Sequence, residues 1–246
     1  MAMVLTPTDE ERAILEPLLQ QFQNDMSGKR LVSTFLKSVL NYIRESTELE
    51  QQIHSIRSRT KDPDHFADKI VRKIRKCKSE GTPFDITPAN LFTKINDLAG
   101  IRLLHLHTRQ IVEIDKSLKA IFHEQPLELV EGPSARTWDD EYRALFGSFN
   151  IETQNSETMY TSVHYVVASK SSTTVTCEIQ VRTLMEEVWG EVDHKVNYPH
   201  ANEHIACTEQ IKALARVTSS ATRLVDSIFA TVADLAKPLQ KPEQQA

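Results

Sequence analysis

The 246-residue chain is poor in glycine and cysteine, with only six and three of them. Long glycine-free stretches favour helices that are joined by short, specific loops. The cysteines (Cys77, Cys177 and Cys207) are odd in number and far apart, which argues against a disulfide framework. This pattern indicates a reducing compartment, so we expect a cytoplasmic protein. There is no CxxC pair, so we do not expect a zinc site built from thiolates.

Several other signals are absent as well. No run of 18 apolar residues occurs, so we expect no membrane partner. The N-terminus lacks the basic segment and apolar block of a secretory signal. Neither GxxxxGK[ST] nor GxGxxG is found, so P-loop and Rossmann folds have no support. The chain is 40% hydrophobic and 26% charged, which is ordinary for a folded protein and excludes wholesale disorder.

Charge is distributed unevenly along the chain. The formal net charge is -5 at pH 7, which does not support a general nucleic-acid binder. Between residues 57 and 78, however, nine lysines and arginines stand against three aspartates. A focused basic segment in an acidic protein indicates one site for an anionic ligand, not a diffuse polyanion surface.

Hydrophobic periodicity separates helical from extended segments. We predict helices over residues 9–26, 30–55, 64–78, 109–123, 184–197 and 202–235. We predict strands over residues 99–106, 162–168 and 173–182. Residues 124–158 are acidic and irregular, and we predict a ligand loop or lid there. In the segment 184–197, one stripe of the predicted helix carries Leu184, Val188, Val192 and Val196.

These elements predict an α+β protein with a mixed β-sheet core flanked by helices. We divide it into a helical N-terminal extension (1–50), a core (51–200) and a C-terminal helical segment with a frayed tail (201–246).

The basic segment has a spacing suited to phosphate. Arg57, Arg59 and Lys61 alternate, so in an extended segment they share one face. The helix that follows returns Lys69 to the same place, and together these side chains are able to clamp a polyphosphate. A solvated basic face is the alternative.

Two acidic residues stand next to predicted strands. Asp97 directly precedes the strand that carries Arg102, so its carboxylate lies at the mouth of a sheet. Glu178, Gln180 and Arg182 share one face of a later strand, which is either the floor of a polar cleft or an exposed edge. A carboxylate beside Asp97 would suit Mg²⁺, which binds one or two carboxylates together with substrate phosphates.

An aromatic residue and a histidine accompany the next predicted strand. Tyr160 at its mouth is able to stack a base, and His164 is able to donate to a phosphate or move a proton. Farther on, Glu187, Glu191, His194 and Tyr198 share one helix face. They either support the site or form ordinary helix surface, and we favour the surface for Glu187 and Tyr198.

Four segments in order resemble a known family. They read HSIRSRTKDPDHFADKI, DLAGIR, YTSVH and EIQVRT…W…DHK, within roughly residues 40–200. Together they resemble the synthetase domain of the RelA/SpoT family, and its small alarmone synthetases in particular. The resemblance implies a nucleotidyltransferase-like synthetase fold. It also implies a Mg²⁺-dependent pyrophosphokinase that transfers pyrophosphate from ATP to the 3′-hydroxyl of GDP or GTP, which gives (p)ppGpp.

The resemblance also implies a role for each residue of the donor site. Arg59 and Arg102 are similar to the arginines that sandwich the adenine of ATP. Lys61 and Lys69 are similar to the lysines that hold its phosphates, with Arg57 assisting.

The catalytic and acceptor roles follow in the same way. Asp97 is similar to the Mg²⁺ ligand, and Glu178 to the residue that completes the metal site or activates the attacking hydroxyl. Tyr160 is similar to the tyrosine that stacks on the acceptor base, and His164 lies near the acceptor phosphates. Gln180 and Arg182 line the same face.

The acceptor segment departs from the family pattern. Members that make guanosine alarmones carry Pro-Lys-x-Asn-Gly before the tyrosine, whereas residues 155–159 read Asn-Ser-Glu-Thr-Met. Between residues 124 and 157 there are eight acids and two arginines. GDP or GTP is the favoured acceptor, while adenosine nucleotides or the 3′ end of tRNA, as in toxin-like members, remain alternatives.

Other interpretations stay open. The chain is either an enzyme or a non-catalytic nucleotide-binding regulatory module. A metal hydrolase would use His194, His200, His204 and Cys207, whose spacing is poor. About 50 residues precede the core, too few for the family's hydrolase half, so we expect a synthesis-only protein.

The final predicted helix carries an apolar stripe. This stripe either closes the core or joins copies of the chain into a homo-oligomer. An antitoxin or another regulatory partner is a further possibility. The stripe consists of Ile205, Leu214, Val217, Leu224 and Ile228.

Overall fold

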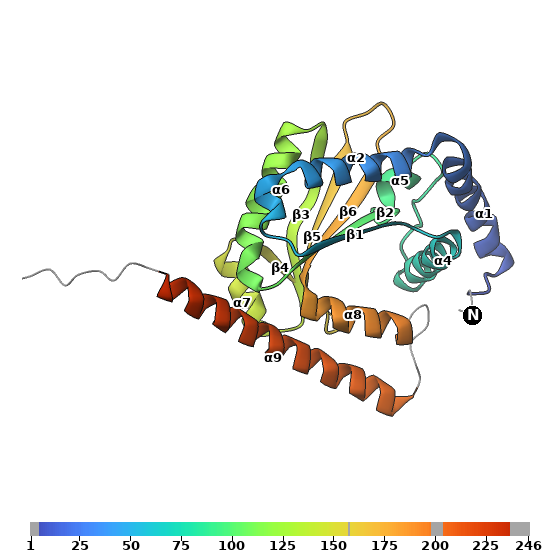
Figure 1. The fold of residues 1–246 in the computed structure, drawn as a ribbon. Coiled ribbons are helices and arrows are strands. Elements are labelled where there is room, and N and C mark those ends of the chain that lie inside the picture. The colour runs from blue at the N-terminus through green and yellow to red at the C-terminus, as the bar shows by residue number, and fades with distance from the viewer. Residues whose placement is uncertain (1–4, 157, 198–203, 237–246) are drawn as a thin grey trace, which may run out of the picture.

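The computed structural model describes residues 5–156, 158–197 and 204–236. One six-stranded sheet lies at its centre, with helices around it (Figure 1). The strands are β1 (Ser55–Thr60), β2 (Ala99–His105), β3 (Leu127–Thr137), β4 (Glu152–Asn155), β5 (Ser162–Ser169) and β6 (Thr176–Thr183). The α-helices are α1 (Asp9–Asn24), α2 (Leu31–Glu45), α3 (Thr47–Glu50), α4 (Pro63–Glu80), α5 (Leu91–Lys94), α6 (Ile111–Glu124), α7 (Asp140–Ser148), α8 (Leu184–Asn197) and α9 (Ile205–Leu235).

The sheet is mixed. Its strand order is β1-β2-β6-β5-β3-β4. The pairs β2–β6 and β3–β4 are parallel, and the pairs β1–β2, β5–β6 and β3–β5 are antiparallel. The predicted fold class, an α+β protein with a mixed sheet flanked by helices, is confirmed.

The register of this sheet aligns one residue from every strand. Because alternate residues of a strand point to the same face, the residues two positions away share that face with the row. The aligned row consists of Arg57, Arg102, Gln180, His164, Ser134 and Glu152. Pairing therefore collects the polar residues of six strands on one face of the sheet.

The core is continuous from the N-terminal helices into the sheet. Phe22 of α1 stacks on Phe66 of α4 with ring centroids 4.7 Å apart, and both rings are fully buried. Val39 and Ile43 of α2 belong to the same cluster of buried side chains as the strand residue Ile179. The division into an extension, a core and a C-terminal segment stays a prediction.

Helix α4, which follows the basic segment, has well-defined ends. Asp62 is its N-cap, and the side chain accepts a hydrogen bond from the backbone N–H of Asp64. Pro63 occupies the first turn, where its missing N–H costs nothing. Gly81 ends the helix with φ of 67°, a conformation that a glycine adopts without strain. These caps fix both ends of α4, the helix that carries Lys69.

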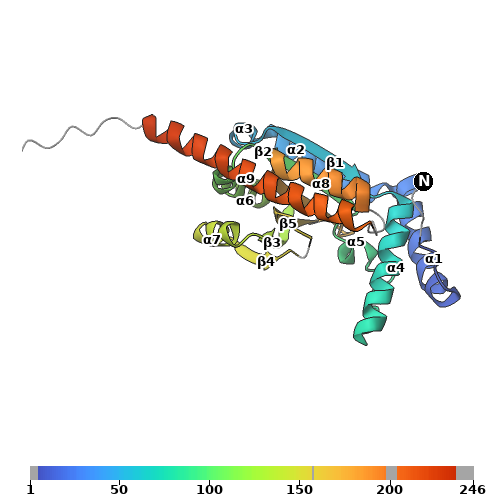
Figure 2. The same cartoon turned by 90° about the horizontal axis from the view of Figure 1, so that it is seen from below.

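Helix α9 runs beside α8 and continues past α7 (Figures 1 and 2). A small cluster of Trp189, Ile211 and Ala215 joins the two helices. The Trp189 indole N–H donates to the carbonyl oxygen of Ile211 at 3.0 Å.

None of the helices in the described part of the chain is long and apolar enough to cross a membrane.

The sequence-based prediction for residues 124–158 was wrong. This segment is no loop or lid, because it forms β3, α7 and β4. The prediction of one helix over residues 30–55 was partly wrong: α2 ends at Glu45, α3 is a single turn, and β1 begins at Ser55. The predicted helices 184–197 and 202–235 and the strands around residues 99–106, 162–168 and 173–182 are confirmed within a few residues.

Much of the apolar stripe on each C-terminal helix lies at the surface. Val188 and Val192 of α8 are 55% and 39% exposed, while Val196 packs against the cluster that joins α8 to α9. The buried face of α8 instead carries Glu186, Glu187 and Trp189.

The stripe of α9 is also largely at the surface. Ile205, Val217, Leu224 and Ile228 are exposed, whereas the face turned to the protein carries Ala215, Thr218, Ser219 and Thr222. Closing the core was therefore the wrong alternative for these four residues, and self-association stays a prediction.

Candidate active site

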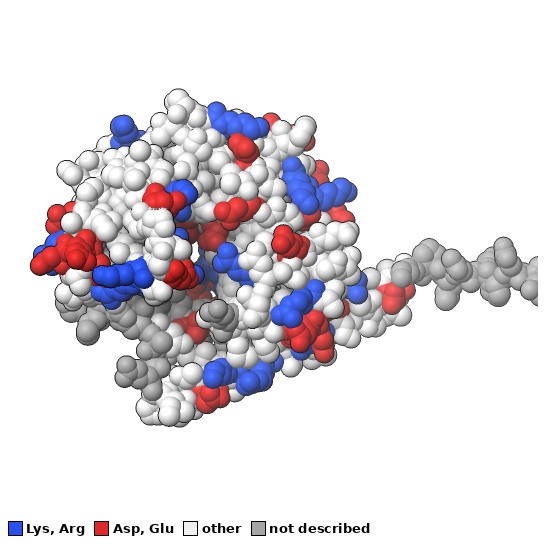
Figure 3. Space-filling view, turned by 180° about the vertical axis from the view of Figure 1, so that it is seen from behind, with Lys and Arg blue, Asp and Glu red and all other residues white. Residues whose placement is uncertain are grey.

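The polar face of the sheet borders three adjoining cavities. Seen from behind, the surface is hollowed near its middle, and acidic and basic side chains gather around this hollow (Figure 3). The three cavities, of about 250, 570 and 810 Å³, all include Asp97 in their walls. Glu178 borders the first and the third. The two carboxylates thus stand where the cavities meet.

The first cavity lies over β1, β2 and β6, with α8 as a wall. Arg57, Arg59 and Arg102 line it, together with Glu191 and His194. Arg59 is paired with Gly100, and the side chain of Arg59 passes 3.9 Å from the position that a Cβ of Gly100 would occupy. The strand pairing therefore brings the three arginines predicted for the donor site to one place.

Asp97 lies between two lysines. Lys61 Nζ is 2.7 Å from Asp97 Oδ2, and Lys69 Nζ is 2.6 Å from Asp97 Oδ1. Burial alone would raise the pKa of Asp97, but the two ammonium groups outweigh it and lower this pKa to about 2. The carboxylate is therefore ionised at neutral pH. Lys61 and Lys69 both border the second cavity, as Arg59 does.

The third and largest cavity extends over β6, β5, β3 and β4. His164, Glu178 and Gln180 border it, with Tyr160 and Arg136 at other parts of the wall. The structure brings all the residues predicted for the acceptor site to this cavity except Arg182, which does not line it. Arg182 is buried, with its guanidinium carbon 5.0 Å from the centre of the Tyr160 ring.

His164 and Glu178 form a buried pair. The Nδ1–H of His164 donates to Glu178 Oε1 at 3.1 Å, because a carboxylate only accepts. Burial lowers the pKa of His164, so we expect a neutral ring at pH 7. Burial would raise the pKa of Glu178, but the hydrogen bond from His164 lowers it below its ordinary value. His164 Nε2 has no hydrogen-bond partner among the described residues.

A chain of hydrogen bonds links Glu178 to Tyr160. Gln180 Nε2 donates to Glu178 Oε2 at 2.9 Å, and the Tyr160 hydroxyl donates to Gln180 Oε1 at 3.3 Å. Glu186 accepts from the backbone N–H of Thr161 at 3.3 Å. Gln180 of β6 thus holds the hydroxyl end of Tyr160, and Glu186 in the first turn of α8 holds the backbone of the next residue.

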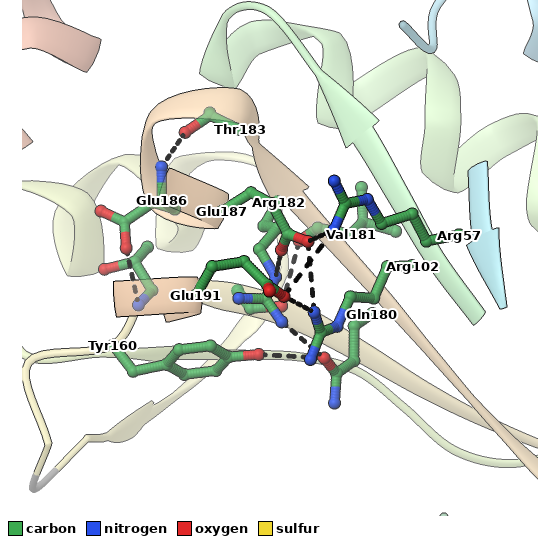
Figure 4. A network of polar contacts seen from close by, with 12 residues as sticks. Arg57, Arg102, Tyr160, Gln180, Val181, Arg182, Thr183, Glu186, Glu187 and Glu191 are labelled. Atoms are coloured by element: carbon green, nitrogen blue, oxygen red, sulfur yellow. Dashed lines mark hydrogen bonds and ion pairs between the residues drawn. The ribbon is translucent and has the colours of Figure 1, made fainter. Parts of the chain in front are cut away.

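Sequence reasoning missed the role of Glu187. We interpreted it as helix surface, but its side chain is only 6% exposed and contacts three arginines (Figure 4). They are Arg57, Arg102 and Arg182. Helical spacing predicted that Glu187 and Glu191 share one face of the helix. It did not predict that this face packs against the arginines of the sheet. Tyr198 lies outside the described residues.

Two more residues of the large cavity were missed. Arg136 and Ser134 of β3 border it, and both come from the segment that we predicted to be a loop. The alternation of the polar Ser134 and Arg136 was the one sign of a strand here. Gly132 and Pro133, which are typical of turns, directly precede it and favoured a loop instead.

The donors fit a hard cation. Asp97 and Glu178 supply carboxylate oxygens at the junction of the cavities, which is the donor type that Mg²⁺ prefers. In the described part of the chain, no group of three or more His, Cys, Asp or Glu side chains is placed to hold a metal. The metal-hydrolase hypothesis therefore has no support there, and its His200 lies outside the described residues.

Comparison with known proteins identifies the family. Residues 58–203 match the family model described as the region found in RelA/SpoT proteins, which is more than half of the chain. The chain belongs to the RelA/SpoT family. The family predicted from the four sequence segments is thereby confirmed. A comparison with curated proteins found no match.

Solved structures share the fold of this RelA/SpoT protein. Small alarmone synthetase 1 from Bacillus subtilis, bound to its product pppGpp, is 21% identical with a TM-score of 0.56, and the match covers 87% of this chain and 98% of that one. A GTP pyrophosphokinase family protein from Streptococcus pneumoniae is 20% identical with a TM-score of 0.55, covering 94% and 100%. Small alarmone synthetase 2 from Bacillus subtilis is 18% identical with a TM-score of 0.54, covering 85% and 99%.

Proposed function

We propose that the chain is an ATP-dependent pyrophosphokinase that transfers pyrophosphate to the 3′-hydroxyl of GDP or GTP, which gives (p)ppGpp. One observation carries this proposal. Asp97 and Glu178 stand between a cavity lined by cationic side chains and a larger cavity that holds a tyrosine. Group transfer between two nucleotides requires such a junction, because donor and acceptor must meet in line.

The donor would occupy the first two cavities. Arg59 and Arg102 offer planar guanidinium groups that stack on a base. Lys61 and Lys69 would then exchange part of their contact with Asp97 for the triphosphate. Their positive charge would stabilise the charge that develops on the phosphate oxygens during transfer.

The acceptor would occupy the third cavity with its base on Tyr160. The oxygen of its 3′-hydroxyl attacks the β-phosphorus of ATP, the bond from this phosphorus to the α–β bridging oxygen breaks, and AMP leaves. Glu178 would accept the hydroxyl proton, and its lowered pKa supports this role because the carboxylate is ionised. His164 would orient this carboxylate through Nδ1 and present Nε2 to the acceptor.

Asp97 and Glu178 would hold Mg²⁺ together with phosphate oxygens of ATP. The bound ion would neutralise charge on the transferred group. Two carboxylates, with no third ligand from the described residues, suit this ion, since it fills its remaining positions with water and phosphate.

The acceptor is the open part of the proposal. The product bound to small alarmone synthetase 1 from Bacillus subtilis, pppGpp, supports a guanosine nucleotide. The altered residues 155–159 leave adenosine nucleotides and the tRNA 3′ end as outcomes to be tested. We also propose a cytoplasmic location, self-association through α9, and an antitoxin or another regulatory partner.

A labelling experiment tests the proposal. Purified protein receives Mg²⁺ and γ-³²P-ATP together with GDP, GTP, ADP, AMP or bulk tRNA, each in a separate reaction, and the products are separated by thin-layer chromatography. We expect label on GDP and GTP. Label on an adenosine nucleotide or tRNA instead would reassign the acceptor, and absence of label from every acceptor would contradict the enzyme and favour the non-catalytic module.

A further inference from the structure

Glu187 connects the two halves of the site. It lies on the buried face of α8 (Figure 4). One of its carboxylate oxygens contacts arginines that line the first cavity, and the other contacts Arg182, which packs on Tyr160 beside the third cavity. Because the side chain is 6% exposed, these contacts are shielded from solvent, and water does not readily replace a lost partner.

One oxygen serves the donor side. Glu187 Oε1 accepts from Arg102 Nη1 at 3.1 Å and lies 3.5 Å from Arg57 Nη1. Arg102 and Arg57 both line the first cavity. The pKa of Arg102 is raised, since the attraction of Glu187 and Glu191 outweighs burial, so the guanidinium group stays charged.

The other oxygen serves the acceptor side. Glu187 Oε2 is 3.3 Å from Arg182 Nε, an ion pair without hydrogen-bond geometry, and the side chain of Arg182 is 4% exposed. Among the described residues neither atom has a hydrogen-bond partner, so this buried charge pair is the contact that each of the two atoms makes. Arg182 Nη2 donates to Gln180 Oε1 at 2.9 Å, the same oxygen that accepts from the Tyr160 hydroxyl. The Arg182 guanidinium also lies over the Tyr160 ring. The orientation of Tyr160 therefore depends on Arg182, and that of Arg182 on Glu187.

We propose that Glu187 is a positioning residue that couples ATP binding to the acceptor shelf, through Arg102 on one side and Arg182 on the other. This inference rests on the proposed function. A ligand that stacks on Arg102 fixes its guanidinium group and with it the shared carboxylate. An ordered Glu187 side chain holds Arg182 against Tyr160. Binding of either nucleotide therefore lowers the entropy cost of ordering the side chains that bind the other nucleotide. Coupling of this kind is reciprocal for the two ligands.

Two neighbours on α8 provide matched controls. Glu191 contacts Arg102 at 2.7 Å and Arg57 at 3.8 Å, and within the described part of the chain it makes no contact with Arg182. Gly190 lies next to Arg182, on the acceptor side. A Cβ added at Gly190 would come within 2.6 Å of Arg182 Nη1. Glu191→Gln therefore disturbs the donor side alone, and Gly190→Ala disturbs the acceptor side alone.

The experiment combines kinetics with binding. For wild type, Glu187→Gln, Glu191→Gln and Gly190→Ala, we would measure KM for ATP and for the acceptor identified by labelling. The Kd of a non-hydrolysable ATP analogue would be measured by calorimetry with and without that acceptor. Thermal melting reports whether each variant is folded.

We expect the acceptor to tighten analogue binding to the wild type about fivefold or more. Glu191→Gln should raise KM for ATP and keep this coupling, and Gly190→Ala should raise KM for the acceptor. Glu187→Gln should raise both KM values and reduce the coupling factor to about one. If Glu187→Gln fails to fold, Arg182→Lys, which keeps the charge but loses the Nε contact, should reduce the coupling in the same way.

Two results would overturn the inference: a wild-type coupling factor of one, or a Glu187→Gln variant that behaves like Glu191→Gln. These results differ from failure of the proposed function, in which the wild type labels no acceptor at all.

Discussion

Asp97 is the carboxylate that lies where the three cavities meet. Two lysine ammonium groups hold it ionised, and all three cavities share it. We predict that Asp97→Asn lowers pyrophosphate transfer about 100-fold or more, because the anionic oxygen for a bound cation is lost. The labelling assay measures this change.

Stability needs a separate measurement for that variant. Lys61 is buried and loses its anionic partner, so we expect Asp97→Asn to unfold at a lower temperature while it remains folded at 25 °C. Glu80→Gln, at an exposed ion pair on α4, is the matched control and should change neither property. Transfer at the wild-type rate by Asp97→Asn would remove Asp97 from the proposed metal site.

Glu186 gives a prediction about pH. Burial raises its pKa from 4.5 to about 7, so between these values the folded chain holds a proton that the unfolded chain has released. Stability therefore falls as the pH rises through this window. Glu186→Gln keeps an oxygen for the Thr161 N–H and has no charge to bury. We expect this variant to exceed the wild type in stability at pH 8 by up to about 3 kcal/mol.

Urea unfolding at pH 5 and pH 8 provides the test. The difference between Glu186→Gln and wild type should be larger at pH 8. An equal difference at both values would mean that Glu186 does not titrate in this window.

At the scale of elements, Asp139 joins α9 to the N-terminus of α7. Its Oδ1 accepts from the backbone N–H of Glu141 at 3.0 Å and caps α7, while Oδ2 accepts from Ser219 Oγ at 2.9 Å and pairs with Arg223. We predict that Asp139→Ala lowers the free energy of unfolding by about 3 kcal/mol, because the cap and two partners are lost. Asp139→Asn keeps the capping oxygen and should cost about half as much.

Urea denaturation measures both Asp139 variants. Glu209→Gln, which removes an exposed ion pair of α9, is the control and should stay within about 0.5 kcal/mol of wild type. If the Asp139 variants also stayed within this range, the contact between α7 and α9 would contribute nothing to stability.

The elements also show what the sequence was able to predict. Strands β2, β5 and β6 are continuous and apolar on at least one face, so their pattern was legible, and with them Asp97, Glu178 and His164. Strand β3 has register shifts near Glu131, and Gly132 there lies so close to β5 that a Cβ would be 2.2 Å from the carbonyl oxygen of His164. These irregularities break the alternation on which strand prediction depends.

Strand β4 and helix α8 were misjudged for other reasons. β4 has four residues at the edge of the sheet, and none is buried. In α8, the core-facing residues Glu186 and Glu187 are charged and the exposed Val188 and Val192 are apolar, which inverts the usual pattern. The arginines of the sheet explain why Glu187 is buried, and the Thr161 N–H meets the buried Glu186. The positions of these partners follow from tertiary structure.

At the scale of the whole molecule, charge distinguishes two kinds of acceptor. The net charge is -5, while cationic side chains are concentrated at β1 and α4. We predict that transfer to a free nucleotide falls less than about threefold between 50 and 200 mM salt, because few charges are screened. A tRNA acceptor held through six phosphates would lose roughly 10³ in affinity over the same range.

Initial rates and acceptor KM values over this salt series make the comparison. A steep loss of transfer rate with a free nucleotide would contradict this prediction. It would mean that basic residues outside the second and third cavities, which Lys69 borders, also take part in binding.

The row of paired residues across the sheet has an evolutionary consequence. The members that we propose for the donor side, Arg57 and Arg102, come from β1 and β2, whereas His164, Ser134 and Glu152 come from β5, β3 and β4. The two groups meet only at β6. With the proposed roles, mutations on β3 and β4 would alter which molecule receives the pyrophosphate while the ATP side is inherited unchanged. A lineage with this sheet is free to diversify its products one strand at a time.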